Sequence, residues 1–294
     1  MLFEQIETNK KKSIIIVILF IFLVLLTGAA LSYYLVGNLT IGLVSTAIFM
    51  SIYVPISIST AKKIVMRMNH ARKITTSEQA PQLWNIVEGL AIAARIPMPE
   101  IYIIQEDSPN AFAAGLSPST ASIAVTTALL EQLNREELEG VIAHEIAHIK
   151  NYDVRLTTIS LALVAIIAII SDFATSFIFR NSDNKNPILL IISLILLILS
   201  PVIAQAIHFS LSRNREFLAD ASGAELCRNP QALASALEKI SSNSNKVDNI
   251  PRSAASMYIS DPFKKKKTKK QSSISRIFST HPPTEERIKR LMNM

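Results

Sequence analysis

Residues 134–150 read NREELEGVIAHEIAHIK. Asn134 is followed three residues later by Glu137, a spacing typical of the capping box that begins a helix. Apolar side chains then recur at helical spacing, at Leu138, Val141, Ile142 and Ile149. The stretch therefore predicts one helix that packs an apolar side into a core, around which the rest of the chain must be arranged.

The same helix carries the pattern His-Glu-x-x-His. Positions four apart lie on one face of a helix, so His144 and His148 can point two imidazole rings at one metal ion. Glu145 projects beside them, where it can take a proton from a water at the metal. This pattern is the core of a zinc peptidase site, so we expect a metal-dependent hydrolase.

Four long apolar runs flank this region, in a chain of 294 residues of which 49% are hydrophobic. The runs are Ile14–Tyr34, Leu39–Ser59, Thr157 to about Phe179, and Ile188–Ile207. About 20 apolar residues cross the hydrocarbon core of a bilayer, so each run predicts a transmembrane helix. Only residues 36–38 and 180–186 separate the members of each pair, which predicts two helical hairpins.

Basic residues flank one side of these predicted spans. They are Lys10, Lys11, Lys12, Lys62, Lys63, Arg67, Arg72, Lys73, Arg213 and Arg215. Lysine and arginine mark the cytoplasmic side of a membrane protein, so both termini and the His144 region are expected in the cytoplasm. Most of the net charge of +7 is explained in this way, and we expect no nucleic-acid binding. The single cysteine, Cys227, suits a reducing compartment.

The expected fold is mainly α with a small β-sheet. Ser77 is expected to cap a helix that runs to about Arg95, and strands are expected at residues 100–105, 110–114 and 122–126. Further helices are expected over residues 231–240 and 285–294. The expected units are a transmembrane hairpin at 1–60, the first part of a metalloprotease domain at 61–156, a second hairpin at 157–208, and the second part of the domain at 209–294.

A catalytic zinc site needs a third protein ligand and one position for water. Glu216 is the best candidate, because it follows the fourth apolar run on the expected cytoplasmic side. Asp220 lies one helical turn later on the same face, where it can accept the free ring N–H of a zinc-bound histidine. Zinc is the expected metal, one per chain, although two histidines and a carboxylate also suit iron or manganese.

Four stretches give the sequence a more specific character. They are Ala143–Ile149, Arg215–Asp220, Asn110–Gly115 and Ser279–Ile288. With the two hairpins in their places, the chain resembles the HtpX-type membrane zinc metalloproteases, which are related to the CAAX prenyl proteases of eukaryotic membranes. The resemblance covers essentially the whole chain and implies a zincin-like domain in a bacterial inner membrane that cuts misfolded or damaged membrane proteins.

The resemblance also implies roles for individual residues. His144, His148 and Glu216 would bind zinc, and Glu145 would act first as general base and then as general acid. His281 would hydrogen-bond the tetrahedral intermediate. A strand at the edge of the cleft would pair with an extended substrate backbone, and it contains Asn110, Ala111, Phe112 and Ala113.

Other functions stay open at this point. A dedicated CAAX-type processing protease is one alternative, although those relatives have more membrane spans. A catalytically silent zinc-binding membrane protein is another, but it would have no use for Glu145. A transporter or channel would place ionisable residues inside its bundle, where only Asp172 is a candidate. The lysine run at 264–270 is either a solvated loop or a contact with anionic lipid.

Overall fold

The computed structural model describes residues 2–160, 162–163, 213–242, 258–259 and 282–294. Within these residues the order of helices and strands is α1 (Leu2–Val36), α2 (Leu39–Met68), β1 (Arg72–Ile74), η1 (Ser77–Gln79), α3 (Pro81–Ala94), β2 (Glu100–Ile104), β3 (Ala111–Ala114), η2 (Pro118–Thr120), β4 (Ser122–Thr126), α4 (Thr127–Gln132), α5 (Arg135–Lys150), α8 (Arg213–Cys227), α9 (Pro230–Ser242) and α11 (Thr284–Leu291). Residues 153–160 are also helical.

The four strands form one sheet in the order β1-β2-β4-β3. Strand β2 runs parallel to β4, whereas β1 and β3 run antiparallel to their neighbours. Ala111 pairs with Val125 and Ala114 with Ser122, so β3 lies along its whole length at the edge of the sheet. The mixed sheet thus has two edges, and β3 is the one that contacts α5.

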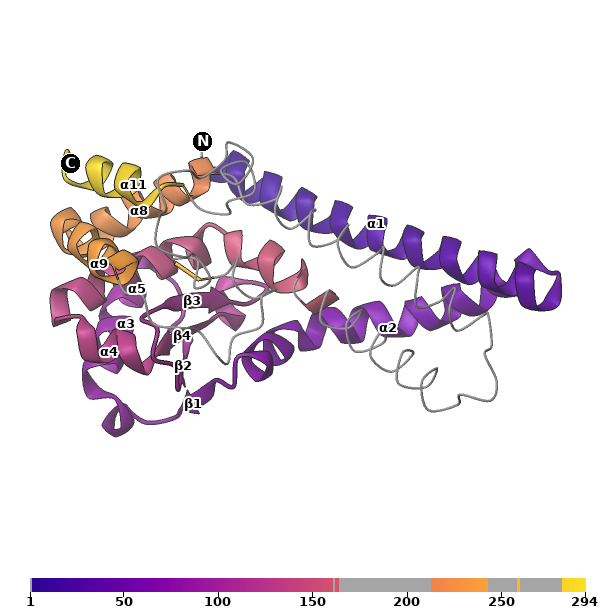
Figure 1. The fold of residues 1–294 in the computed structure, drawn as a ribbon, viewed down its shortest axis with the longest axis horizontal. Helices are drawn as coiled ribbons and strands as arrows, with labels where there is room; N and C mark the ends of the chain where they lie inside the picture. The colour runs from indigo at the N-terminus through magenta and orange to yellow at the C-terminus, as the bar shows by residue number, and fades with distance from the viewer. Residues whose placement is uncertain (1, 161, 164–212, 243–257, 260–281) are drawn as a thin grey trace.

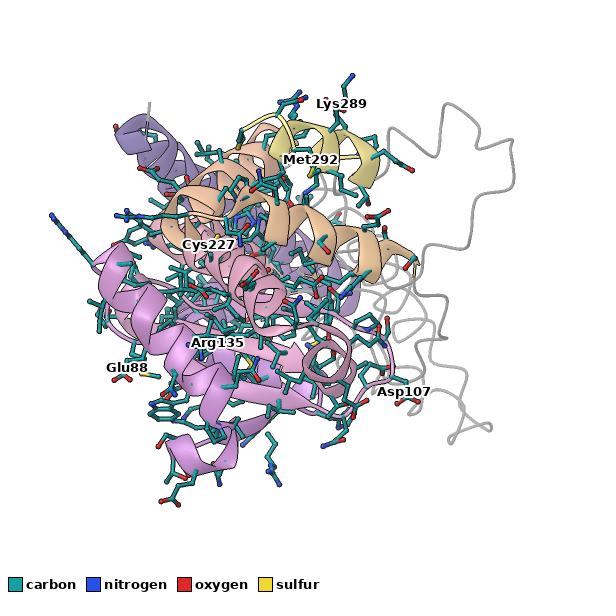
Figure 2. The ribbon with its side chains drawn as sticks, turned by 90° about the vertical axis from the view of Figure 1, so that its left-hand side faces the viewer. Glu88, Asp107, Arg135, Cys227, Lys289 and Met292 are labelled. Carbon is teal, nitrogen blue, oxygen red and sulfur yellow. The ribbon has the colours of Figure 1, made fainter. Side chains whose placement is uncertain are left out.

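The sheet separates two apolar layers. On one face, Ala113, Ile123 and Val125 belong to a core shared with α3, α5 and α9. On the other face, Phe112 and Ala124 meet the end of α2. Helices α8, α9 and α11 lie on the far side of α5 (Figure 1). The polar surfaces of the outer helices point away from this body, as Glu88 and Lys289 do (Figure 2).

Helices α1 and α2 form a long hairpin that projects from this globular part (Figure 1). Gly37 turns the chain between them with φ 69°, and the Asn38 side chain accepts hydrogen bonds from the first backbone N–H groups of α2. Among the described residues, α2 is the one helix long and apolar enough to cross a membrane, with a mean hydropathy of 1.9. Helices α1 and α2 thus pack against each other where the hairpin at 1–60 was expected, and both are longer than their apolar runs. That both cross a membrane stays a prediction.

The structure corrects two expectations in the first half of the domain. Ser77 does not cap the long helix, because it lies in the short η1 turn and α3 begins at Pro81. The strand β1 was not expected, since only one of its three residues is buried and no alternation marks it. The expected second hairpin at 157–208 and the lysine run at 264–270 fall almost wholly outside the described residues.

Candidate active site

Helix α5 presents the His-Glu-x-x-His pattern from a firmly fixed position. Its capping box forms as expected: the Asn134 side chain accepts from the Glu137 N–H at 2.9 Å, and the Glu137 carboxylate accepts from the Asn134 N–H at 3.0 Å. Lys239 of α9 then donates to Glu137 at 2.7 Å. The helix is buried along its core side, so its two histidines have little freedom to move.

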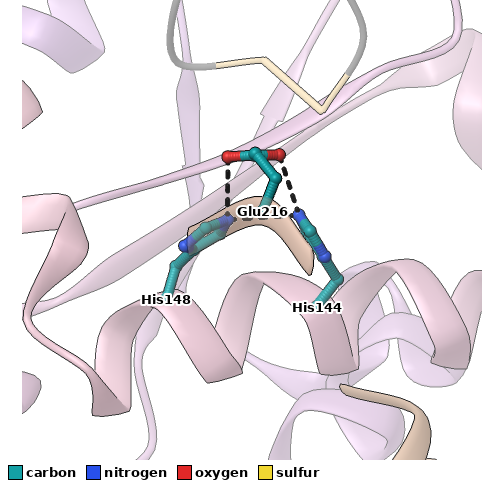
Figure 3. A group of neighbouring side chains, drawn as sticks. All are labelled: His144, His148 and Glu216. Atoms are coloured by element: carbon teal, nitrogen blue, oxygen red, sulfur yellow. Dashed lines mark hydrogen bonds and ion pairs between the residues drawn. The ribbon is translucent and has the colours of Figure 1, made fainter. Parts of the chain in front are cut away.

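Helix α8 brings the predicted third ligand to the two histidines. Gly223 lets the two helices come close, since a Cβ at this position would lie 2.9 Å from the His144 backbone nitrogen. Seven residues earlier on α8, Glu216 faces the imidazole rings (Figure 3). The absence of a side chain at Gly223 is therefore what allows residues 72 positions apart in sequence to converge.

One ligand atom from each of His144, His148 and Glu216 lies within 4.8 Å of the other two. The Glu216 carboxylate is 3.5 Å from His148 Nε2 and 3.9 Å from His144 Nε2. The two Nε2 atoms are 3.2 Å apart. Three donors of the types that zinc prefers thus face one point in a buried region of the protein.

The other nitrogen of each ring is held by a carboxylate. His144 Nδ1 lies 3.0 Å from Asp220, the partner expected from the sequence. His148 Nδ1 lies 3.0 Å from Asp153, which the sequence reasoning missed. In a neutral ring, donation from Nδ1 leaves the lone pair on Nε2, and this arrangement orients histidines in metal sites.

Asp153 owes its position to a tight turn at the end of α5. The helix ends at Lys150, and Tyr152 adopts the left-handed conformation with φ 60°. The turn sends the next residue back toward His148. Arg215 of α8 also approaches Asp153, at 3.7 Å. Asp153 could have been found from the sequence, because it is an acidic residue only five positions after His148.

Arg287 of α11 is a second residue that sequence reasoning missed. Its side chain is 2% exposed and donates from Nε and Nη2 to Asp220 at 2.8 and 2.7 Å. It also lies 3.7 Å from the Glu216 carboxylate. Burial opposes the charge on this guanidinium, but Asp220 and Glu216 outweigh that cost and raise its pKa. Arg287 lies inside the stretch 279–288, in which the sequence argument assigned a role to His281 alone.

Burial shifts the pKa values of His144 and Glu145, whereas for His148 the lowering by burial is outweighed by Asp153 and Glu216, which raise its pKa to about 9. Burial lowers the pKa of His144 to about 4, so this ring is neutral at physiological pH. It raises the pKa of Glu145 to about 7, with the nearby Glu216 carboxylate acting in the same direction. The Asp220 carboxyl is also buried, but Arg287 reverses the effect and lowers its pKa to about 2. The site therefore combines one carboxyl able to exchange a proton with another that stays charged.

The predicted substrate strand lies next to the Glu145 carboxyl. Asn110 immediately precedes β3, and Ala111, Phe112 and Ala113 belong to it; all four are buried. The Ala113 N–H is close enough to the Glu145 carboxylate to favour its charged form. His281 lies outside the described residues. The structure thus brings together every predicted site residue that it describes, with β3 on one side of the glutamate and the histidines on the other.

The sequence also matches a family model. Residues 77–294 match the model described as Peptidase family M48. The chain belongs to this family. The M48 match contains His144, His148, Glu216 and Arg287. It begins at residue 77, after the α1–α2 hairpin.

Relatives of this M48 peptidase extend the match to the hairpin. A protein named Protease HtpX homolog from Listeria monocytogenes serotype 4a (strain HCC23) is 49% identical, and the match covers 100% of both chains. One from Leuconostoc citreum (strain KM20) is 44% identical, again over 100% of both. Together with the apolar helix α2, these findings identify the chain as a membrane metallopeptidase.

A solved structure shows the same fold. The crystal structure of Ste24p from S. mikatae matches 98% of this chain with a TM-score of 0.50 and 17% sequence identity. The match covers 66% of the Ste24p chain, so this M48 peptidase spans about two thirds of its length. The similarity supports a fold that is mainly helical with a small mixed sheet.

Proposed function

We propose that this chain is a zinc-dependent endopeptidase of the cell membrane that hydrolyses misfolded or damaged membrane proteins. The observation that carries the proposal is the buried convergence of His144, His148 and Glu216, with Glu145 beside them at a pKa of about 7. The donor set is two imidazoles and one carboxylate, which leaves room in a tetrahedral zinc site for water. The substrate class follows from the resemblance to the HtpX-type proteases.

The mechanism divides the work among the side chains. Bound zinc would polarise the substrate carbonyl and make water a stronger nucleophile at neutral pH. Glu145 takes the proton of the attacking water and passes it to the leaving amine, and a pKa near neutrality suits both transfers. Asp220 and Asp153 hold His144 and His148 so that each presents Nε2. His281 is proposed to hydrogen-bond the tetrahedral intermediate. Because water attacks the carbonyl directly, no covalent intermediate with the enzyme is needed.

Substrate is proposed to bind in an extended form along β3. Strand addition at a sheet edge supplies backbone hydrogen bonds without demanding a particular sequence. A protease that removes damaged proteins needs such tolerance. Asn110, Ala111, Phe112 and Ala113 are the proposed substrate-binding residues, and Ala113 is the one next to Glu145.

The site is proposed to face the cytoplasm, with both termini on that side and four membrane spans in total. Lys62, near the end of α2, donates to Glu100 of β2 at 2.7 Å. The sheet is thus attached directly to the basic end of the apolar helix. Because basic residues favour the cytoplasmic side, the same end that carries Lys62, Lys63 and Arg67 would carry the active site.

The test compares the wild type with Glu145→Gln and Glu88→Gln, each purified in detergent and loaded with zinc. Glu88 is an exposed glutamate on α3 and serves as the matched control. With casein as an unfolded substrate, wild type and Glu88→Gln should cut it, whereas Glu145→Gln should bind zinc equally and not cut. A chelator should stop the wild type.

Two results would count against the proposal. Equal cleavage by the zinc-loaded wild type and Glu145→Gln would remove the general base from the mechanism. Cleavage of a prenylated CAAX peptide by the wild type, with casein left intact, would instead favour a dedicated processing protease.

A further inference from the structure

Along the edge strand β3, the backbone N–H and C=O groups of successive residues point alternately toward β4 and away from the sheet. Thr126 of β4 donates its N–H to the Asn110 carbonyl at 3.0 Å. In an antiparallel pair the residues that bond the neighbouring strand alternate with residues whose N–H and C=O point outward. Ala111 and Ala113 are therefore the outward-facing residues. They are the two positions at which another chain could hydrogen-bond to this edge.

The Ala111 position is already occupied by a distant part of the same chain. Ile259 donates its N–H to the Ala111 carbonyl at 3.0 Å. The Tyr258 ring meets the Phe112 ring edge-on at 4.9 Å between centroids. Tyr258 packs on the α2 face of the sheet and Ile259 on the α5 face, as consecutive residues of a strand do. These two residues lie against the outer side of β3, which remains the edge strand of the sheet.

This contact is fixed at both ends. The Tyr258 hydroxyl donates to Asn69 Oδ1 at 2.9 Å, and the Ile259 carbonyl accepts from Arg287 Nη1 at 3.1 Å. Tyr258 is 0% exposed and Ile259 2% exposed. Both side chains are thus completely buried, and the hydrogen bond from Arg287 is charge-assisted, which makes it stronger than a neutral one.

The other end of the edge is closed as well. Gly115, directly after β3, donates its N–H to the Thr158 hydroxyl at 2.9 Å, and Thr158 is fully buried. Gly115 has φ 154°, and a Cβ there would lie 2.7 Å from the Ala121 backbone. The chain therefore has a fixed course on this side of Ala113 too.

We propose that β3 offers a substrate backbone one pairing position, at Ala113, because Ile259 and Thr158 occupy the positions on either side. This inference rests on the proposed function and narrows its four substrate-binding residues to one backbone position, since the Ala111 carbonyl is already bonded. It makes Ile259, Tyr258 and Thr158 specificity-determining residues. Among the described residues, no hydrogen bond to the Ala113 carbonyl is found. Its N–H is hydrogen-bonded to Glu145, so the carbonyl that remains for a substrate lies beside the proposed general base.

The consequence is a short recognition footprint. A long edge would reward substrates that are extended over many residues. A single position fixes the peptide group next to the scissile bond and takes little account of more distant residues. The enzyme would therefore accept any segment flexible enough to present about one residue pair in extended form.

The test uses a fluorescein-labelled peptide hydroxamate, whose chelating end fixes the register on the zinc-loaded wild type. Versions with one backbone nitrogen methylated at a time are compared by fluorescence anisotropy. Methylation of the nitrogen that donates to Ala113 should weaken binding about tenfold, as expected for one lost hydrogen bond with a buried acceptor. Methylation elsewhere should change the Kd by less than about threefold.

The variant Ile259→Pro lacks the N–H that occupies Ala111, and Ile259→Val is the matched control that keeps it. In Ile259→Pro a second sensitive nitrogen should appear two residues from the first, while Ile259→Val should behave as the wild type. Tenfold losses at two such positions in the wild type would overturn the inference, whether or not Ile259→Pro folds. If no hydroxamate binds at all, the proposed metal site itself fails and this inference fails with it.

Discussion

Replacement of Gly223 by alanine tests how the two halves of the site are held together. The added Cβ would lie 2.9 Å from the His144 nitrogen and 3.0 Å from its Cα, where ordinary contact begins at 3.4 Å. Both neighbours are backbone atoms of a buried helix, so α8 must shift by about half an ångström. Overpacking of this kind costs about 1–3 kcal/mol of unfolding free energy.

The larger effect should be on the metal. Glu216 and Asp220 lie on the same helix as Gly223, so they move with it away from His144 and His148. Zinc–ligand distances tolerate changes of only about 0.2 Å. We expect Gly223→Ala to lower zinc affinity at least tenfold, measured by competition with a chromogenic chelator, and to lower kcat/KM for casein by a similar or larger factor.

Two other glycines separate this effect from simple destabilisation. A Cβ at Gly140 of α5 would lie 2.9 Å from the Leu233 nitrogen of α9, so Gly140→Ala should cost similar stability by displacing α9, which carries no proposed metal ligand. Gly89 in α3 has open space around it, so Gly89→Ala should stabilise the helix by about 0.5–1 kcal/mol. If Gly223→Ala and Gly140→Ala bind zinc and cut casein equally, the close approach at Gly223 does not position the site.

Three further results are expected. Asp153→Asn should weaken zinc binding about 10- to 100-fold, read by chelator competition, because a neutral amide is a weaker acceptor for the His148 Nδ1–H than the carboxylate and can turn its NH2 toward the ring; unchanged affinity would contradict this. Glu137→Gln should lower the unfolding free energy by about 1–2 kcal/mol in urea titrations, since it loses its charged contact with Lys239. Burial alone would raise the pKa of Glu137, but Lys239 and Ser235 lower it overall. The contribution of Glu137 to the unfolding free energy is therefore present above the unfolded pKa of about 4.3 and fades as pH falls through the folded pKa. If the unfolding free energies of Glu137→Gln and wild type fall equally with pH in acid, the assignment is refuted. Removal of metal with EDTA should abolish casein cleavage, and zinc should restore it; full activity after chelation would exclude a metal mechanism.

Local sequence signals predicted the parts of the fold that local physics decides. The capping box at Asn134 fixed the start of α5 to the residue, because the reciprocal hydrogen bonds involve only neighbours. Residues 122–126 form β4 as expected, since a short apolar run between turn residues has few other options. The predicted start of α3 at Ser77 was wrong, because Thr76 and Gln79 form a separate short turn before the helix begins at Pro81. Strand β1 forms by pairing with β2, and a stretch of three residues carries too little pattern to predict that pairing.

The candidate site shows the same division. His144 and His148 were found from spacing within one helix, and the structure places Glu216 and Asp220 where the sequence argument expected them. Asp153 was missed because its role depends on the left-handed turn at Tyr152. Arg287 was missed because a buried arginine is recognisable only once its carboxylate partners are known. The roles of all these residues in catalysis stay predictions.

The site is assembled from segments that are synthesised at very different times. Arg287 follows Asp220 by 67 positions and His144 by 143. While the ribosome is still translating the region beyond α5, the histidines exist without Glu216, and Glu216 later exists without the arginine that neutralises its surroundings. A nascent chain would thus carry an incomplete centre until Arg287 has been translated, 71 residues after Glu216.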